Sequence, residues 1–327
     1  MMAEKTNSIS DLNTLDTPQR DLLVDAFYRL TKNKAAMAGS IIIAIFILMA
    51  IFAKQLAPYN PIEIHSGKGF LPPVWLKEGP NGAIPDPAFL LGTDTLGRDV
   101  LSRTIYGARV SIVVGFLPTI IILVMGVTIG LISGYAGGRV DNILMRLTDV
   151  VYAFPDLLFF IIAMITLRDT WFGQLFNGLA LLFCALAVVN WVAVARVVRG
   201  QVLSIKEKEF IEAARCVGAR DLHIMFKHIM PNSLGPVIIL TAFSIPMMII
   251  TEAILGYLGL GMRPSTNPND IFLTSWGSML LEGQSALNAQ PWVLLIPAIC
   301  VALVVLSFTF LGDGFRDALD PRLQGTE

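Results

Sequence analysis

The sequence has few charged residues, few cysteines and few histidines. Only 15% of its 327 residues are Asp, Glu, Lys or Arg, against about a quarter in a typical soluble domain. The formal net charge is -1 and no run of Lys or Arg occurs, which argues against a nucleic-acid-binding protein. The three cysteines, Cys184, Cys216 and Cys300, form no CxxC pair, so we expect small, buried hydrophobic side chains.

Common catalytic and nucleotide-binding patterns are also absent. The chain contains no GxxxxGK[ST] phosphate loop, no HExxH metal motif and no GxSxG motif. His223 and His228 would lie about 140° apart around an α-helix, so they do not form an i, i+4 metal pair. The acidic turn GTDTLGRD (92–99) lacks the ligand set of a calcium loop. We therefore expect no catalytic residue, no metal site and no cofactor bound by this chain.

Long apolar runs dominate what is present. The chain is 54% hydrophobic, with a mean hydropathy of +0.67. A membrane-spanning helix needs about 20 mostly apolar residues. Six segments approach this length, at 35–57, 109–135, 151–168, 175–196, 233–256 and 291–312. The predicted fold is all-α, a polytopic membrane protein with six transmembrane helices.

The distribution of positive charge predicts the orientation. With the N-terminus inside, about two thirds of the 24 Lys and Arg residues fall on the cytoplasmic side, so both termini are predicted to be cytoplasmic. The domains are then a cytoplasmic segment 1–34, which ends in a surface helix at 21–31, an uncleaved first transmembrane helix 35–57, an external Pro/Gly-rich loop 58–107, and a five-helix core 108–327 with a cytoplasmic loop 198–232. A second external loop, 257–290, is predicted to contain a short helix around Ser275–Glu282.

Small residues and prolines recur within the apolar segments. Four glycines stand at every fourth position of the second span and just beyond it, namely Gly126, Gly130, Gly134 and Gly138. Such a strip allows close helix packing, and a flexible gate is the alternative function. The prolines expected to interrupt or bend helices are Pro118, Pro155, Pro246 and Pro297.

Glu252 is a carboxylate predicted to lie at membrane depth, near the outer end of the fifth span. Such a residue is expensive to bury and is a candidate for the translocation path or an outer gate. The alternative is a structural carboxylate that is hydrogen-bonded to a neighbouring helix. Repeated intramembrane charges, as in an ion-coupled carrier, are missing.

The loop after the fourth apolar segment has a helical pattern that is interrupted by Gly218. A capping box at 204–207 predicts a helix start, and Gly218 predicts the helix end. The predicted apolar face of this helix comprises Phe210, Ala213, Ala214 and Val217. A second helix is predicted from about Arg220 to Pro231, with an apolar face of Leu222, Met225, Phe226 and Ile229.

The stretch EAARCVGARDLHIMFKHIMPN (212–232) resembles the EAA loop of bacterial ABC importer permeases, in which EAAxxxG is followed by IxLP. The residues that match are Glu212, Ala213, Ala214, Gly218 and Pro231. His228 and Met230 replace the general Ile and Leu, a variation associated with the oligopeptide/dipeptide branch. Three further stretches resemble that branch, at 91–111, 133–155 and 311–322. The additional first span resembles its C-type permease subunit.

This resemblance implies the type I ABC importer permease fold and a non-catalytic role. The EAA loop would dock on a cytoplasmic ATPase that binds ATP and Mg²⁺, and the charged residues Arg215, Arg220, Asp221 and Lys227 would flank the contact. Implied partners are a homologous second permease, two ATPases and an external peptide-binding protein, at a bacterial inner membrane. The implied cargo is a di- or oligopeptide, with nickel chelates or glutathione as alternatives. Outside this family, an ion-coupled secondary carrier and a structural membrane scaffold remain as hypotheses.

Overall fold

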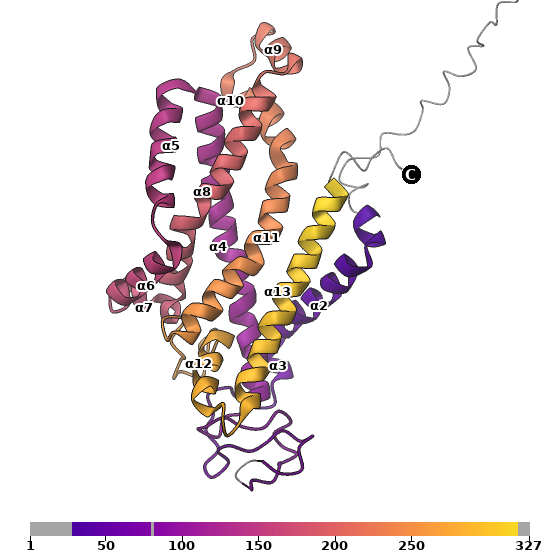
Figure 1. The fold of residues 1–327 in the computed structure, drawn as a ribbon, viewed down its shortest axis with the longest axis vertical. Coiled ribbons are helices and arrows are strands. Elements are labelled where there is room, and N and C mark those ends of the chain that lie inside the picture. The colour runs from indigo at the N-terminus through magenta and orange to yellow at the C-terminus, as the bar shows by residue number, and fades with distance from the viewer. Residues whose placement is uncertain (1–27, 80–81, 320–327) are drawn as a thin grey trace, which may run out of the picture.

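A computed structural model describes residues 28–79 and 82–319. Within these residues the regular elements are helices, together with one isolated bridge between Thr93 and Asp99. The all-α prediction is confirmed for this part of the chain. The predicted surface helix at 21–31 lies mostly outside it. The helices (Figure 1) are α2 (Lys34–Ile51), α3 (Ala53–Leu56), α4 (Val100–Ala136), α5 (Gly138–Tyr152), α6 (Asp156–Leu167), α7 (Trp171–Gln174), α8 (Leu179–Lys206), α9 (Glu209–Cys216), α10 (Asp221–His223), α11 (Met230–Tyr257), α12 (Trp276–Ala286) and α13 (Pro291–Leu319).

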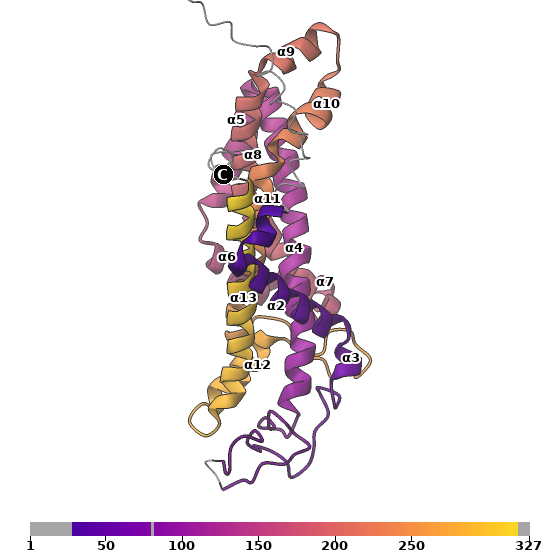
Figure 2. The same ribbon diagram turned by 90° about the vertical axis from the view of Figure 1, so that its right-hand side faces the viewer.

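The helices form an elongated bundle with two distinct ends. One end carries α9 and α10, and we call residues 207–220 between α8 and α10 the elbow (Figures 1 and 2). The opposite end, the loop end, carries the irregular segment 57–99 and α12. The start of α2 and the end of α13 both point toward the elbow end. With 37 residues, α4 is about 55 Å long and runs through most of the bundle.

Five helical runs in the described residues are long and apolar enough to span a membrane, at 34–51, 100–136, 171–206, 221–257 and 291–319. The predicted third span at 151–168 is not one continuous helix, and the interruption expected at Pro155 is observed. The structure instead has two helices, α5 and α6, bent by 78°. Pro155 is the N-cap of α6 and disfavours helical geometry in the preceding residue. Counted as one broken span, this pair raises the number of spans to six.

Several predicted boundaries also need correction. The external loop 58–107 ends earlier, because α4 begins at Val100. The capping box at 204–207 does not start a helix. Instead α8 continues to Lys206, because Val202 and Ile205 are buried in the core, so the loop predicted at 198–232 is helical in its first part. Three of the expected helix interruptions are also absent, since continuous helices contain Pro118, Pro246 and Pro297.

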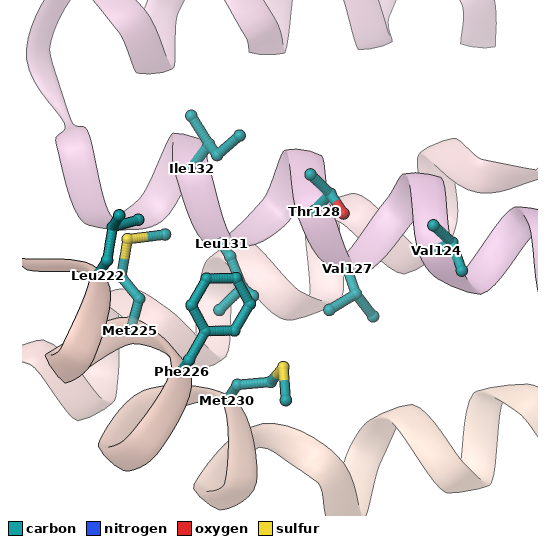
Figure 3. Close-up of a pocket in the computed structure, with 9 residues that line it drawn as sticks. All are labelled: Val124, Val127, Thr128, Leu131, Ile132, Leu222, Met225, Phe226 and Met230. Atoms are coloured by element: carbon teal, nitrogen blue, oxygen red, sulfur yellow. The ribbon is translucent and has the colours of Figure 1, made fainter.

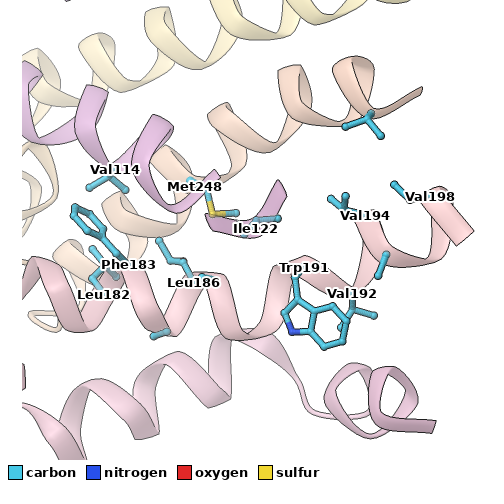
Figure 4. Close-up of a cluster of buried hydrophobic side chains, with 14 of the residues drawn as sticks. Val114, Ile122, Leu182, Phe183, Leu186, Trp191, Val192, Val194, Val198 and Met248 are labelled. Carbon is cyan, nitrogen blue, oxygen red and sulfur yellow. The ribbon is translucent and has the colours of Figure 1, made fainter. Parts of the chain in front are cut away.

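The main core lies where α4 crosses α8 (Figure 4). A Cβ atom on Gly126, Gly130 or Gly134 would lie 2.6–2.7 Å from Val194 Cβ, Ala195 O or Val202 Cβ on α8. Three glycines of the strip thus form the seam between these helices. Gly138 does not belong to it, because the chain turns at Gly137 (φ 64°) and a Cβ on Gly138 would meet nothing within 4 Å.

The predicted burial is wrong for Cys184 and Cys216, which are exposed, and holds in part for Cys300, which is half-buried against a core cluster. In α8 the residues on either side of Cys184 are buried, Phe183 and Ala185. Cys184 therefore lies on the outward face of α8, where the surrounding medium rather than the protein covers it.

Helix α12 packs tightly against two spans at the loop end, close to its predicted position. Trp276 donates a hydrogen bond from Nε1 to Thr104 O at 2.9 Å, and a Cβ on Gly107 would lie 2.4 Å from the indole ring. A Cβ on Gly256 of α11 would lie 2.5 Å from Gly277 Cα of α12. These close approaches fix α12 against both α4 and α11.

Candidate functional site

The elbow contains one short helix that ends at a glycine turn. Gly218 has φ 87°, a region that residues with a Cβ adopt at a cost of about 1–2 kcal/mol. The amide of Ala219 donates to Ala214 O at 3.0 Å and that of Gly218 to Arg215 O at 2.9 Å. This pair of bonds is the Schellman motif, which satisfies carbonyls at the end of α9. The predicted helix stop at Gly218 is thus observed.

The elbow has an inner and an outer face, and they differ from the predicted ones. Ile211 is fully buried, and Ala214 packs against the same core cluster. Phe210 and Val217, predicted to share the apolar face with Ala214, are 42% and 89% exposed. Glu212, Ala213 and Gly218 are exposed on the same outer surface. The EAA residues therefore present an open surface that combines one carboxylate with apolar side chains, projecting from the bundle as Figure 2 shows.

The second predicted helix of the loop is continuous with α11. Residues Ile224–Ile229 form a π-helical segment that joins α10 to α11. This π-helical segment ends two residues before Pro231. In a regular α-helix the ring of Pro231 would clash with the carbonyl four residues earlier. The wider turn also corrects the predicted separation of the two histidines. The ring centroids of His223 and His228 lie only 5.9 Å apart. No group of three metal-ligating side chains occurs among the described residues.

Beside this segment lies an apolar groove (Figure 3). Its two walls are formed by α4 and by the α10–α11 junction. Of the predicted apolar face of the second helix, Ile229 is fully buried, whereas Leu222 is 68% and Phe226 is 56% exposed. The residues that line the groove are Val124, Val127, Thr128, Leu131, Ile132, Leu222, Met225, Phe226 and Met230.

Two of the four charged residues predicted to flank the ATPase contact also contact Tyr135 of α4. Asp221 Oδ1 accepts a hydrogen bond from Tyr135 Oη at 2.5 Å. The Arg215 guanidinium lies 5.7 Å from the centre of the same ring. The four predicted residues, Arg215, Arg220, Asp221 and Lys227, are all exposed. Each is thus accessible on the surface of the elbow end, and Arg215 and Asp221 additionally contact Tyr135.

A second polar contact stabilises the turn from α4 into α5. Arg199 of α8 binds Asp141 with two hydrogen bonds of 2.6 Å, from Nε to Oδ1 and from Nη2 to Oδ2. Ser133 Oγ donates to the same carboxylate. Gly137 and Gly138, both with positive φ, make the sharp turn that brings Asp141 back to α4. The stretch SGYAGGRVD therefore encodes a three-helix junction next to the elbow.

Arginine side chains compensate the negative charge of the acidic turn 92–99 at the loop end. Arg103 of α4 is 1% exposed and donates to Asp94 and to Glu282 of α12. Arg98 donates to Asp94 Oδ2 at 2.7 Å and to Glu282 Oε2 at 2.7 Å. Burial raises the pKa of the Asp94 carboxyl, but the charges of Arg103 and Arg98 outweigh this effect and hold that pKa below its usual range. This cluster fastens the loop to α4 and α12.

Glu252 lies in the interior where α11 meets α12. It is fully buried, and neither carboxylate oxygen has a hydrogen-bond partner among the described residues. A Cβ on Gly277 would lie 3.1 Å from Glu252 Oε1, so the carboxylate lies at the N-terminal turn of α12. Ser275, the N-cap residue of α12, is the polar side chain that interacts with this carboxylate, so a structural carboxylate stays the alternative to a role in the translocation path.

Comparison with known proteins identifies the family of this helical architecture. Residues 126–325 match the binding-protein-dependent transport system inner membrane component family. The chain belongs to this family. Residues 22–73 match the N-terminal TM domain of oligopeptide transport permease C. The first span and the core of this family member thus match two separate family models, with the first span preceding the core as the sequence resemblance implied.

Several curated relatives align with this transport-system component over nearly their whole length. The oligopeptide transport system permease protein OppC of Bacillus subtilis (strain 168) is 38% identical, covering 96% of this chain and 94% of the relative. The dipeptide transport system permease protein DppC of the same strain is 36% identical, with coverages of 96% and 90%. The glutathione transport system permease protein GsiD of Pectobacterium atrosepticum is 36% identical, with coverages of 94% and 92%.

A solved structure supports the fold. The MetNI methionine ABC transporter in an inward-facing conformation aligns with a TM-score of 0.53 at 16% identity, covering 67% of this chain and 97% of that chain. At this identity the likeness concerns the fold alone. The predicted ABC importer permease fold is confirmed.

Sequence reasoning missed the polar partners of the elbow in this family member. Tyr135, Lys206 and Arg199 were not predicted as site residues. Tyr135 lies within a stretch that carries the family resemblance (133–155), so a signal was present. That stretch could not reveal its partner, because 86 residues separate Tyr135 from Asp221.

Proposed function

We propose that this chain is the transmembrane permease subunit of an ATP-driven importer of di- or oligopeptides in a bacterial inner membrane. The elbow end is cytoplasmic, the loop end is external, and both chain termini are inside. The exposed EAA surface of the elbow carries this assignment, since a surface with one carboxylate and exposed apolar side chains suits a protein partner better than lipid or water. The curated relatives support the peptide cargo, and the glutathione relative keeps that tripeptide as an alternative.

The chain itself catalyses nothing in this proposal. Two cytoplasmic ATPases bind ATP and Mg²⁺, and one of them docks on Glu212, Ala213, Ala214 and Gly218. The residues that flank this contact are Arg215, Arg220, Asp221, Lys227 and Pro231. A homologous second permease completes the pore, and an external peptide-binding protein delivers the cargo at the loop end. ATP binding can favour one orientation of the pore only if the ATPases contact the permeases differently in the two orientations. Glu252 lies near the external side of this path.

The docking surface is tested by reversing one charge. Glu212→Lys in the complete transporter should abolish ATPase co-purification and peptide uptake, while the chain remains in the membrane. Glu78→Lys is the matched control, because Glu78 is exposed in the loop-end segment. Gly218→Pro, which cannot adopt φ 87°, should have the same effect as Glu212→Lys. Normal uptake in both elbow variants would refute the docking assignment.

A further inference from the structure

Tyr135 meets three parts of the chain in and around the elbow. It lies in the last turn of α4, which ends at Ala136. Its hydroxyl donates to Asp221 at the start of α10, at 2.5 Å. Its carbonyl accepts from Lys206 Nζ at the end of α8, at 2.8 Å. Arg215 of α9 lies over its ring, 5.7 Å from the centre. The residues that enter and leave the elbow are therefore both attached to the end of α4.

The remaining attachment of the elbow to the bundle is modest. Ile211 is the one fully buried side chain of α9, and Ala214 and Ala219 are partly buried small residues. These apolar contacts are not directional, whereas a hydrogen bond from a phenol to a carboxylate has a defined geometry and is among the stronger polar contacts. Tyr135 and Asp221 thus supply orientation that the apolar contacts do not.

Helix α4 connects Tyr135 at the elbow end to Arg103 at the loop end. Gly126, Gly130 and Gly134 hold α4 against α8 at backbone distance. About 50 Å away along the same helix, Arg103 binds Asp94 and Glu282. A displacement at Tyr135 would therefore be carried by one uninterrupted helix to α12.

We propose that Tyr135 is a positioning residue that couples the elbow to α4. This inference rests on the proposed function, because it concerns the motion that a docked ATPase imposes on the elbow. Through its bond to Asp221, Tyr135 makes α4 and α8 follow the elbow as one body. Arg215 and Asp221 contribute to this internal link while remaining exposed.

The test measures peptide taken up per ATP hydrolysed by the reconstituted transporter. Tyr135→Phe removes the hydroxyl and keeps the ring, and Tyr257→Phe is the matched control at an exposed ring near the opposite end. Tyr135→Phe should leave ATPase co-purification unchanged and lower the uptake per ATP by roughly three- to tenfold, the range expected for losing one solvent-accessible hydrogen bond. Asp221→Ala should lower it similarly, and the double variant should be no worse than either single variant.

Each outcome has one meaning. An unchanged ratio in Tyr135→Phe, with an active wild-type transporter, overturns the coupling role alone. Loss of ATPase co-purification in Tyr135→Phe also overturns it, because the residue would then act in docking. Additive losses in the double variant show that Tyr135 and Asp221 act separately and refute the proposed link. A wild-type complex without ATP-driven uptake overturns the proposed function and this inference together.

Discussion

Replacing Gly130 by alanine tests whether the glycine strip is a packing seam. A Cβ at this position would lie 2.6 Å from Ala195 O, 2.7 Å from Val198 Cβ and 2.9 Å from Val198 Cγ1. Carbon atoms in favourable contact are separated by about 3.5–4.0 Å. The two helices would have to separate by roughly 0.8 Å at the crossing, and overpacking of this kind typically costs about 1–3 kcal/mol.

Gly200→Ala provides a matched control in the same pair of helices. Gly200 lies within α8, and its Cβ would meet nothing within 4 Å. Both substitutions gain about 0.5–1 kcal/mol of helix propensity, so this gain cancels in their difference. Gly130→Ala should therefore be less stable than Gly200→Ala by about 1–3 kcal/mol. Unfolding of the purified variants in the same detergent measures this difference.

Equal stability of the two variants would contradict the packing interpretation. It would mean that α4 and α8 separate without cost at the crossing, as the flexible-gate alternative requires. A lower transport rate in Gly130→Ala with unchanged stability would likewise favour the gate. The structure predicts a loss of stability, because two of the three closest atoms belong to Val198 on the opposing helix and the third is backbone.

Two further predictions concern carboxylates at the loop end. Asp94→Asn should destabilise the protein at neutral pH by roughly 1.5–3 kcal/mol, because Arg103 loses one charged hydrogen-bond partner but keeps Glu282. The pKa of Asp94 is lowered in the folded state. The contribution of its charge to the free energy of unfolding is therefore complete above the unfolded pKa of about 3.9 and is lost as the pH falls through the lower folded value. Acid unfolding of the wild type and of Asp94→Asn measures this contribution, and a stability difference that does not change with pH would contradict it. Glu252→Gln should retain the fold and lower peptide uptake, and wild-type uptake at every pH examined would refute a role in the translocation path.

The long apolar runs predicted most of the architecture, because a spanning helix leaves a strong and local signal. The exact helix ends were less predictable. The capping box at 204–207 has the pattern of a helix start, yet burial of Val202 and Ile205 keeps α8 helical through it. The break between α5 and α6 was expected from Pro155, but the sequence did not show that a helix begins as early as Gly138.

The candidate site was predicted in its motif but not in its contacts. The Gly218 turn follows from local backbone geometry and could be read from the sequence. The contacts that Arg215 and Asp221 make with Tyr135 could not, because Tyr135 is distant from both in sequence. The histidine pair was misjudged for a different reason. The 140° separation assumed an α-helix, whereas the segment before Pro231 is π-helical.

The energy source of uptake tests the central claim most directly. The chain, its second permease and the two ATPases would be reconstituted in liposomes that enclose ATP. The binding protein would deliver a labelled dipeptide from outside, and the dipeptide that enters the liposomes would be measured. The account predicts uptake that requires hydrolysable ATP and is lost in Glu212→Lys. Uptake by this chain alone, driven by a proton gradient without ATP, would contradict it.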